Sequence, residues 1–514
     1  MKRYILLSAF AVALSAQAQN TYLNENITNS SSDVIGTARY VGMGGALGAL
    51  GADISVISWN PAGIGLIRKN DVALTFGGTW GKSRIEEVGR GKATFDQAGF
   101  VYNMRTGSES VPYVNFSFNF QKKINFNHNF YADNDNLGGL SQMDQVAGLT
   151  DYVTDNNTSL AGLAYDNNFF LADGNFMYNN IRASSNTFTH HSEGSLQSFD
   201  FNLSTNIQDR VFLGLTVGLD NMRYRGWNSY WEYQNGEYNH DVYNDIQISG
   251  TGVNFKLGTI IRPVEDSPFR FGLTVETPTW LRLRNSTVMN LNDIYKDGVE
   301  SFLKFSLRTP WKFRAGIGST IGRSFAWDID YEFADYVGMS MSYPDNSYYP
   351  YDINSNSMKD VAMNRHSRQY LRGTHTVRVG LEANATRNLS FRLGYNFSSS
   401  AYEKDVSFDQ LHIADEGSTA MRDYSTNTNY MRRGNTNILT LGMGYHWKSF
   451  YIDLAYKLRN QFADFYAFDT SFTYNDPVYE RNVASQYIDL AQKLDPVEVN
   501  LTRHAITCTL GFKF

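Results

Sequence analysis

The side chains best suited to binding chemistry are cations and carboxylates that share one face of consecutive strands. If the hairpin in this part of the chain is centred on Gly322, Arg314 faces Asp330 and Lys312 faces Glu332 across the two strands. Opposite charges at directly opposed strand positions attract each other. A structural ladder of ion pairs is therefore the simplest interpretation.

A second interpretation is that one arginine of such a polar face is unpaired and binds a ligand. Arg314, Arg378 and Arg392 all fall at strand positions that alternate with apolar residues. A guanidinium binds a carboxylate through two parallel, charge-assisted hydrogen bonds. These three arginines are therefore candidate ligand contacts, and replacing them by alanine should weaken the binding of a ligand that carries a carboxylate.

Residue patterns that support catalysis are missing from the sequence. There is no HExxH, no Cys/His cluster with zinc spacing and no Gly-x-Ser-x-Gly elbow, and the nine histidines are scattered. His190, His191 and His240 fall in expected outer loops, where they are compatible with a metal or haem but are more often solvent-facing residues. We therefore expect no enzyme activity, no catalytic residue, no cofactor and no bound metal.

Strands must position these residues, because the dominant pattern is strict alternation of apolar and polar side chains. In the segments 199–207, 211–220 and 325–333, every second residue is apolar and the residues between them are polar, glycine or charged. A period of two places alternate side chains on opposite faces of a strand. A soluble sandwich also alternates, but ionised groups on the polar face suit a water-filled or ligand-filled lumen.

Fourteen segments of this kind are expected to be strands. They are 71–83, 96–105, 112–126, 196–207, 211–224, 252–262, 268–277, 309–319, 325–336, 375–384, 389–398, 437–447, 450–459 and 501–514. The connections alternate between short ones, such as 208–210, and long ones, such as 127–195, as in outer-membrane barrels. The sequence therefore predicts an all-β fold, a 14-stranded antiparallel transmembrane β-barrel over residues 71–514.

The composition excludes two other classes of protein. Of the 514 residues, 19% are charged and 15% are aromatic, with 33 Tyr and 34 Phe. A disordered chain would lack these aromatics. A helical membrane protein would need apolar runs of about 18 or more residues, which the sequence does not contain.

The two ends of the chain agree with an outer-membrane location in a Gram-negative bacterium. Lys2 and Arg3 precede the apolar stretch 4–14 and the small residues of 16–18, so residues 1–18 are expected to be a secretory signal peptide. The last strand ends at Phe514, which resembles the assembly signal of outer-membrane barrels. We therefore expect Phe514 to contact the barrel assembly machinery, and the single cysteine, Cys508, to be a small lipid-facing residue of this strand.

Residues 19–70 differ from the rest of the chain. The stretch 36–53 is rich in glycine and alanine, and Asn60-Pro61-Ala62-Gly63 follows it. A dinucleotide-binding turn would need a glycine at Leu47 and a preceding strand, and both are missing. Small residues suit a segment that packs inside a narrow lumen, where its backbone approaches the wall closely. We therefore expect 19–70 to be an N-terminal plug.

The small-residue segment, Asn60-Pro61-Ala62 and the fourteen-strand pattern together resemble the FadL family of outer-membrane transporters for long-chain fatty acids and other hydrophobic compounds. The segments 272–278 and 307–310 are also similar, and the long loops look like those of Bacteroidetes-type members. The resemblance implies capture by the outer loops, binding in the lumen and sideways release at a kinked third strand, with the N-terminal hatch as the gate. The expected third strand, 112–126, has no internal Gly or Pro that would produce this kink.

The expected loop 127–195 is the best candidate for capturing a ligand. Its apolar residues recur at helical spacing and are followed by a pair of aromatics, and the candidate contacts are Leu137, Leu140, Phe169 and Phe170. An apolar loop helix can form a capture groove or can simply cover the mouth of the barrel. The loop has eight Asp or Glu and one Arg, which disfavours nucleic acid and suits divalent cations that bridge lipopolysaccharide.

The expected partners are thus a hydrophobic small molecule, outer-membrane lipid or lipopolysaccharide, and the assembly machinery, for a barrel that is expected to be a monomer. Two alternatives remain open. One is an outer-membrane lipase or protease, whose catalytic groups would meet at the outer rim. The other resembles the FadL-like shuttle of type IX secretion, which carries cargo at the cell surface.

Overall fold

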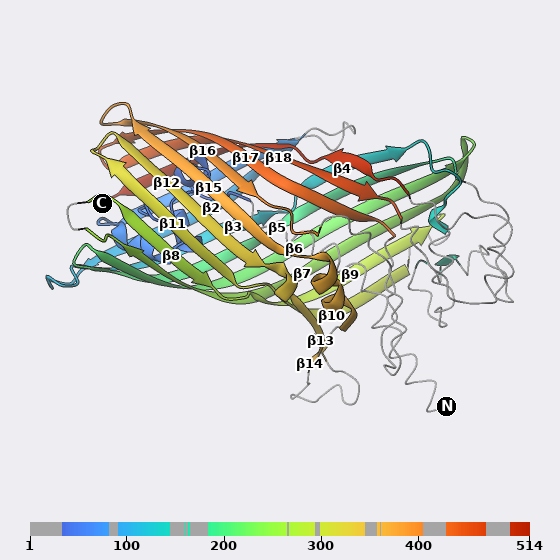
Figure 1. The fold of residues 1–514 in the computed structure, drawn as a ribbon, viewed down its shortest axis with the longest axis horizontal. Helices are drawn as coiled ribbons and strands as arrows, with labels where there is room; N and C mark the ends of the chain where they lie inside the picture. The colour runs from blue at the N-terminus through green and yellow to red at the C-terminus, as the bar shows by residue number, and fades with distance from the viewer. Residues whose placement is uncertain are drawn as a thin grey trace.

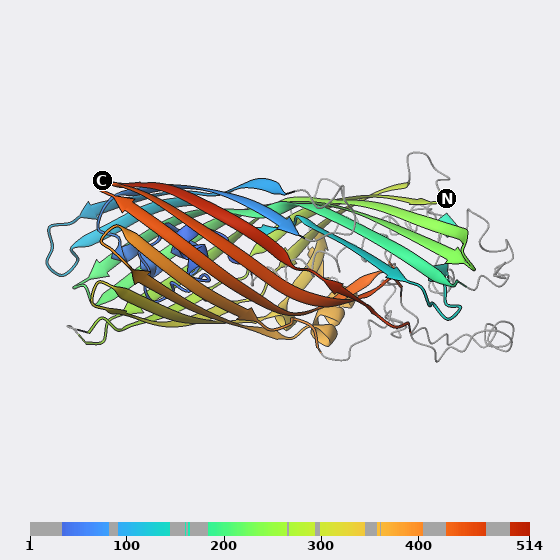
Figure 2. The same ribbon diagram turned by 90° about the horizontal axis from the view of Figure 1, so that it is seen from above.

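The computed structural model describes residues 33–81, 91–143, 160, 163–164, 183–264, 267–292, 299–344, 357–359, 361–403, 428–468 and 494–514. Within these ranges the chain forms one closed antiparallel barrel of fourteen strands, as the sequence predicted. Figures 1 and 2 show a long tube whose strands are steeply tilted. No helix of the described ranges is long and apolar enough to cross a membrane.

Eight of the described barrel strands are single elements and six are interrupted. The single elements are β1 (Asp71–Gly81), β2 (Lys92–Arg105), β5 (Ser185–Ile207), β6 (Val211–Gln234), β7 (Glu237–Ile261), β16 (Leu389–Ser398), β17 (Tyr430–Trp447) and β18 (Phe450–Tyr466). The interrupted strands are β3 (Tyr113–Asn125) with β4 (His128–Asn134), β8 (Arg270–Glu276) with β9 (Trp280–Leu291), β10 (Val299–Arg308) with β11 (Lys312–Ile321), β12 (Phe325–Asp335) with β13 (Ser340–Pro344), β14 (Ser357–Lys359) with β15 (Gly373–Asn384), and β19 (Val497–Asn500) with β20 (Arg503–Lys513).

The first and last strands pair with each other and close the ring. Asp71 lies opposite Lys513, and the ladder continues to Gly81 opposite Arg503. Closure removes the unpaired edges of a sheet, which is what allows a β-structure to span a bilayer.

The two faces of the wall have the character that the alternation predicted. On β6, Leu215 is 47% exposed and Leu219 is 46% exposed, whereas the intervening Thr216 is fully buried. Exposed large apolar side chains recur on the outward face of the other strands, including Leu257, Phe271, Leu441 and Leu510. An apolar outer belt around a closed wall is the surface that lipid tails cover.

Several strands are longer than predicted. β5 begins at Ser185 where 196 was expected, β6 ends at Gln234 where 224 was expected, and β7 begins at Glu237 where 252 was expected. The predicted loop 127–195 is therefore wrong at both ends, which belong to β4 and β5. The hydrogen-bonded ladder continues beyond the apolar belt, and the outward face there is polar, so the alternation that marks a membrane strand ends before the strand does.

Two prolines explain why the predicted strand 268–277 ends too early and the predicted strand 309–319 begins too late. Pro278 separates β8 from β9, and Pro310 separates β10 from β11. Proline has no N–H and breaks the ladder. At this break the Thr309 N–H donates to the Thr279 carbonyl at 3.1 Å, so both strands continue in the same sheet.

The predicted centre of the β11–β12 hairpin is wrong by one residue. The turn is Gly322-Arg323-Ser324, with Ile321 opposite Phe325, so Arg314 lies opposite Glu332 and Gly316 lies opposite Asp330. Gly322 has a φ of 58°, a left-handed conformation that glycine adopts without strain. A three-residue turn of this kind shifts every cross-strand pair relative to a turn centred on Gly322.

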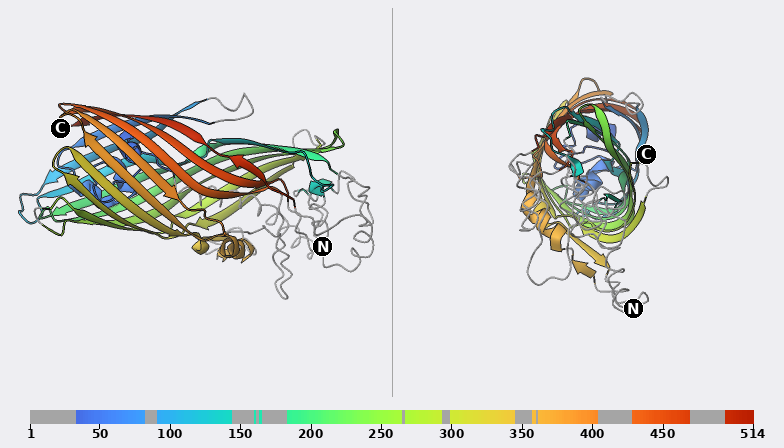
Figure 3. Two further views of the ribbon diagram at one scale, coloured as in Figure 1. Left: turned by 45° about the horizontal axis from the view of Figure 1, so that its top comes forward. Right: turned by 90° about the vertical axis from the view of Figure 1, so that its right-hand side faces the viewer.

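Residues 33–70, called the inner segment below, lie within the ring of strands, as the end-on view of Figure 3 shows in blue. The segment contains α3 (Ala38–Gly42) and the 3-10 helices η2 (Ile54–Ser58) and η3 (Pro61–Leu66). The side chains of Thr37, Asp53 and Asn60 cap these three helices. The remainder of the predicted plug, 19–32, and the predicted signal peptide lie outside the described residues.

Glycines on the inner wall allow the inner segment to approach the strands closely. A Cβ at Gly394 would overlap the backbone of Met43 and Gly44, and one at Gly214 would overlap the backbone of Pro61. The same holds at Gly272, which faces the backbone of Gly48. The small residues of both surfaces therefore permit backbone-to-backbone contact, as their composition suggested.

Candidate functional site

The Asn60-Pro61-Ala62-Gly63 motif joins the inner segment to the wall. The Asn60 Nδ2 amide donates to the Gly48 carbonyl at 2.7 Å and to the Thr259 carbonyl of β7 at 3.3 Å, while its Oδ1 accepts from the Ala62 N–H. Asn60 is 2% exposed. The motif thus fixes both the fold of the inner segment and its position against the wall.

Two aspartates of β12 hold the other side of the inner segment. The Asp330 Oδ2 accepts the Gly48 N–H at 2.8 Å and the Trp59 Nε1–H at 3.0 Å. The Asp328 Oδ2 accepts the N–H groups of Ala49 and Leu50 at 3.1 and 2.7 Å. These carboxylates satisfy backbone donors that would otherwise be buried without partners.

Two of the predicted ligand-contacting arginines enclose Trp59. The guanidinium carbon of Arg378 lies 3.5 Å from the centre of the indole ring, and that of Arg314 lies 4.4 Å from it. Arg378 also donates to the Tyr40 hydroxyl at 2.7 Å. Cation–π contacts of this kind attach the inner segment to β11 and β15.

Arg314 and Arg392 each bridge two carboxylates. Arg314 donates to Glu332 and Glu276, each at 2.6 Å. Arg392 donates to Glu382 at 2.7 Å and to Asp453 at 2.6 Å. These contacts match the ladder interpretation, in which the cations of the polar face are neutralised by the wall itself.

A different set of cations lies on β17, β18 and β20. Arg459 is directly opposite Arg503 in the ladder, and both side chains point inward. Arg433 is buried nearby, and among the described residues its Nε and that of Arg459 have no hydrogen-bond partner. Like charges at directly opposed positions destabilise a sheet, and the cost grows with burial.

One carboxylate of the inner segment lies beside this set. Asp33 accepts a hydrogen bond from Lys457 Nζ at 2.7 Å. Burial raises the pKa of Asp33, but the charges of Lys457, Arg503 and Arg459 outweigh this effect and hold the pKa below its ordinary value. In the described lining of the cavity at this place, the three cations Lys457, Arg459 and Arg503 outnumber the carboxylates Asp33 and Asp96, which leaves an excess of positive charge.

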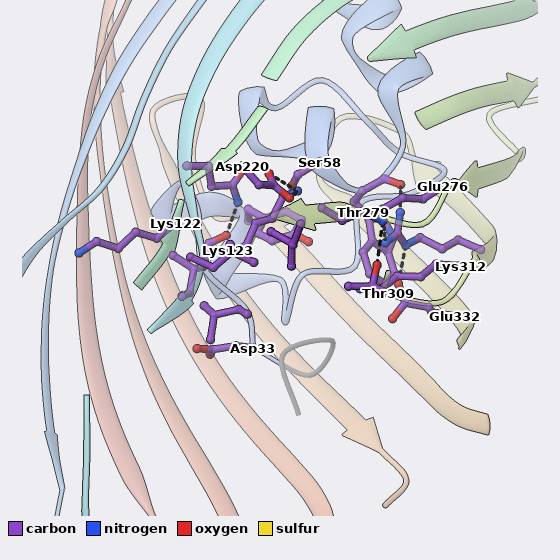
Figure 4. Close-up of a pocket in the computed structure, with 18 of the residues that line it drawn as sticks. Asp33, Ser58, Lys122, Lys123, Asp220, Glu276, Thr279, Thr309, Lys312 and Glu332 are labelled. Atoms are coloured by element: carbon purple, nitrogen blue, oxygen red, sulfur yellow. Dashed lines mark hydrogen bonds and ion pairs between the residues drawn. The ribbon is translucent and has the colours of Figure 1, made fainter. Parts of the chain in front are cut away.

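Two cavities meet at Asp33 and Ile35. The larger, of about 100 Å³, lies between the inner segment and the wall, and its lining includes Lys123, Glu276 and Arg314. Figure 4 shows Lys123 beside Asp220 on one side of this cavity and Glu276, Lys312 and Glu332 on the other. The smaller cavity, of about 30 Å³, is lined by Lys457, Arg459 and Arg503.

The smaller cavity also borders a break in the wall. Pairing between β2 and β3 ends at Gln97 opposite Gln121, although β2 continues to Lys92 and β3 to Asn125. Beyond this point Lys122 Nζ lies 3.7 Å from the Asp96 carboxylate. Asp96 and Asn125 line the smaller cavity, so its lumenal cations lie next to the place where the ladder between β2 and β3 stops.

A β-bulge on β3 lies at this break, and the register of β1 with β2 shifts at Asp96 on the other side of it. Lys122 lies opposite Gln197 of β5 and Ile124 lies opposite Leu196, so Lys123 is an extra residue. A bulge bends the strand and reverses the phase of its side chains. No internal Gly or Pro marks it in the sequence, and the sequence signal is the pair Lys122-Lys123, which interrupts the alternation of Phe116, Phe118 and Phe120.

Between the charged cavities and the outer end of the barrel, the inner wall is apolar. Inward-facing side chains of several strands form one buried cluster, which includes Ile124, Leu196, Met222, Leu283 and Phe305. Towards the outer end, Leu137 and Leu140 belong to a second buried cluster with Phe188 and Phe465. Leu137 and Leu140 are 1% and 6% exposed, so they pack inside the barrel mouth, whereas Phe169 and Phe170 lie outside the described residues.

The histidines are not arranged as a metal site. His190 and His191 are neighbours on β5 and therefore point to opposite faces: His190 is buried inside, and His191 stacks on Trp227 outside. The His190 Nδ1–H donates to the Asn228 Oδ1 at 2.6 Å. No group of three or more His, Cys, Asp or Glu within the described ranges could hold a metal ion.

The apolar belt on a closed fourteen-strand wall defines an integral β-barrel of a Gram-negative outer membrane. Among solved structures, a FadL homologue of Pseudomonas aeruginosa is similar to it, with 13% identity, a TM-score of 0.52, and coverage of 93% of this chain and 98% of that chain. The toluene transporters TbuX of Ralstonia pickettii and TodX of P. putida match with 12% and 11% identity, TM-scores of 0.49 for both, and coverage of 94% of this chain and 99% of theirs. No protein-family model and no curated protein sequence matches the chain.

Proposed function

We propose that this barrel transports hydrophobic compounds that carry an acidic group, such as long-chain fatty acids, across the outer membrane. The observation that carries the proposal is the excess of buried cations on β17, β18 and β20, where Arg459 directly opposes Arg503 and, within the described residues, neither forms an ion pair with a carboxylate. Buried charges are normally paired, so an anionic ligand group is the natural partner of this site.

The apolar surfaces of the lumen suit the remainder of such a molecule. The cluster at the outer end, with Leu137 and Leu140, would receive the ligand, and the inner wall around Met222 and Leu283 would contact its chain. The neighbour with the same fold is described as a FadL homologue, and others are described as toluene transporters. Transport of a hydrophobic compound is thus compatible with both the fold and the lining.

The break between β2 and β3 would be the exit, and the inner segment would be the gate. The smaller cavity is lined by both Asp96 of β2 and Asp33 of the inner segment. A ligand held by Arg459 and Arg503 would compete with Asp33 for these cations and would loosen the start of the inner segment. No enzyme activity is part of this proposal.

Binding measurements on the purified full-length barrel test the proposal. Palmitate and hexadecanol have the same chain length but differ in the acidic group, and toluene represents a neutral aromatic compound. We expect palmitate to bind at least about tenfold more tightly than hexadecanol, since a charge-assisted hydrogen bond contributes about 1.5–3 kcal/mol. Equal binding of palmitate and hexadecanol, or tighter binding of toluene, would contradict an acidic ligand.

A further inference from the structure

The outward face of the wall carries a group of exposed cations at the edge of the apolar belt, with Arg308 level with Trp280 and the others beyond it. They lie on β6, β9 and β10, and we call them the basic patch: Arg223, Arg282, Arg284, Lys304 and Arg308. These side chains face away from the lumen and belong to none of the cavities described above.

The strand register places these cations close together. Arg223 lies opposite Ser249 of β7, Ser249 lies opposite Arg284, and Arg284 lies opposite Lys304. With strands about 4.8 Å apart, Arg223 and Lys304 are separated by about 14 Å. Arg282 lies on the same outward face of β9, two residues before Arg284, and is opposite Thr251 and Ser306. Hydroxyl groups therefore lie beside these cations.

The basic patch is not neutralised by the wall. Within the described ranges, none of its five cations forms an ion pair with a carboxylate. Neighbouring outward cations do: Arg225 lies 2.9 Å from Asp245, and Lys92 lies 3.1 Å from Glu193. Among the described residues, outward cations without a carboxylate partner are therefore gathered on β6, β9 and β10.

The height of the basic patch matches the outer headgroup layer. Leu219, Val253 and Trp280 form one apolar row on these strands, and Arg223 and Arg282 follow within four residues. Arg223 is twelve positions beyond Val211, which at about 3.3 Å a residue and a tilt of about 40° is about 30 Å from the short turn at 208–210. The apolar band of such barrels is about 25 Å tall. The cations thus begin where the lipid tails of the outer leaflet end.

We propose that the basic patch binds the phosphate groups of lipopolysaccharide in the outer leaflet. Arginine forks bind phosphate oxygens through paired hydrogen bonds, and Ser249 and Thr251 can donate between them. Trp280, which is 44% exposed, lies at the level where the sugar headgroup meets the acyl chains. The site faces lipid and not the lumen, so it goes beyond the proposed transport function and does not depend on it.

A charge-matched pair of variants tests this site. The first combines Arg223→Gln, Arg282→Gln and Arg284→Gln in the full-length barrel. The control combines Arg323→Gln, Arg387→Gln and Lys448→Gln, which removes three exposed cations from the short turns at the opposite end. Fluorescent lipopolysaccharide is titrated into each purified protein in neutral detergent, and a dephosphorylated form serves as the second probe. Folding is checked by the gel migration of unheated samples.

The patch variant should bind lipopolysaccharide at least about tenfold more weakly than the parent, and the control should stay within about twofold. The parent should bind the dephosphorylated form as weakly as the patch variant binds intact lipopolysaccharide. Equal losses in the two variants, or no loss in either, would overturn the proposal. Displacement by phosphatidylglycerol or by inorganic phosphate at equal concentration would also overturn it, because the site would then recognise any anionic lipid or any phosphate. If the patch variant does not fold, Arg284→Gln alone should give a loss of about threefold or more, and no loss there would count against the site.

Discussion

Replacing Arg459 by glutamine should stabilise the empty barrel and at the same time weaken the binding of an acidic ligand. Arg459 is 5% exposed and lies directly opposite Arg503, and its Nη2 donates to Gln461 Oε1 at 3.1 Å. The empty site therefore holds two like charges together, whereas a bound carboxylate would lie between them. The two effects of the substitution have opposite signs because one concerns the empty protein and the other concerns the complex.

The size of each effect can be worked out from the geometry. Two unit charges about 7 Å apart at an effective dielectric constant of about 20 repel each other by about 2.4 kcal/mol. The lost hydrogen bond to Gln461 offsets about 0.5–1.5 kcal/mol of this relief. The substitution also removes the attraction of Arg459 to Asp33 and its repulsion by Arg433, which oppose each other. The free energy of unfolding of the empty barrel should therefore rise by about 1–2 kcal/mol. Loss of one charge-assisted hydrogen bond to the ligand should weaken palmitate binding about 10- to 150-fold.

Urea unfolding in lipid vesicles measures the first effect, and palmitate titration measures the second. Arg432→Gln is the matched control, because Arg432 is the preceding residue of β17 beside Arg433 and is paired with Asp464 at 2.8 Å. The control should change neither quantity by more than about 0.5 kcal/mol. A less stable Arg459→Gln barrel with unchanged palmitate affinity would refute the reasoning, because Arg459 would then be a structural residue.

Three further predictions concern the gate, the exit and the acid stability of the lumen. Gly394→Val should displace the inner segment from β16, lower the free energy of unfolding by about 1–3 kcal/mol and increase proteolysis within 33–70, whereas Gly338→Val, which faces open space, should do neither. Deletion of Lys123 should remove the bulge and slow palmitate release, while Lys123→Met, which loses only the ion pair to Asp220, should not; equal release rates would contradict an exit at β2–β3. The pKa of Asp33 is lowered in the folded protein, so its contribution to stability is complete above the unfolded value of about 3.9 and is lost only as the pH falls through the lower, folded value. Hydrogen exchange at residues 33–40, corrected for intrinsic rates, should thus be unchanged between pH 7 and pH 5, and Asp33→Asn should increase it at both.

The faces of the strands and the number of strands could be predicted from the sequence because they depend on local patterns. A period of two in the segments 211–220 and 325–333 is enough to assign an apolar outer face and a polar inner face, whatever the neighbouring strands are. The small residues of 36–53 likewise indicate close backbone packing. In the structure the inner segment lies so close to the wall that a Cβ at Gly394 or at Gly214 would overlap its backbone. Composition and alternation therefore determined the closed transmembrane wall and the count of its strands.

The binding chemistry of the lumen was decided by the tertiary structure. Arg314 and Arg392 stood out in the sequence, yet each is neutralised by two carboxylates. Arg459 and Arg503 are far apart in the chain and become neighbours only through the register of β18 with β20. Likewise, the extra residue Lys123 becomes visible only when β3 is paired with β5. The register between two strands depends on the geometry of the turn and on the pairing of the whole strands. A turn longer by one residue, or one extra residue in a strand, therefore shifts every cross-strand pair that follows. No local pattern in the sequence records this shift.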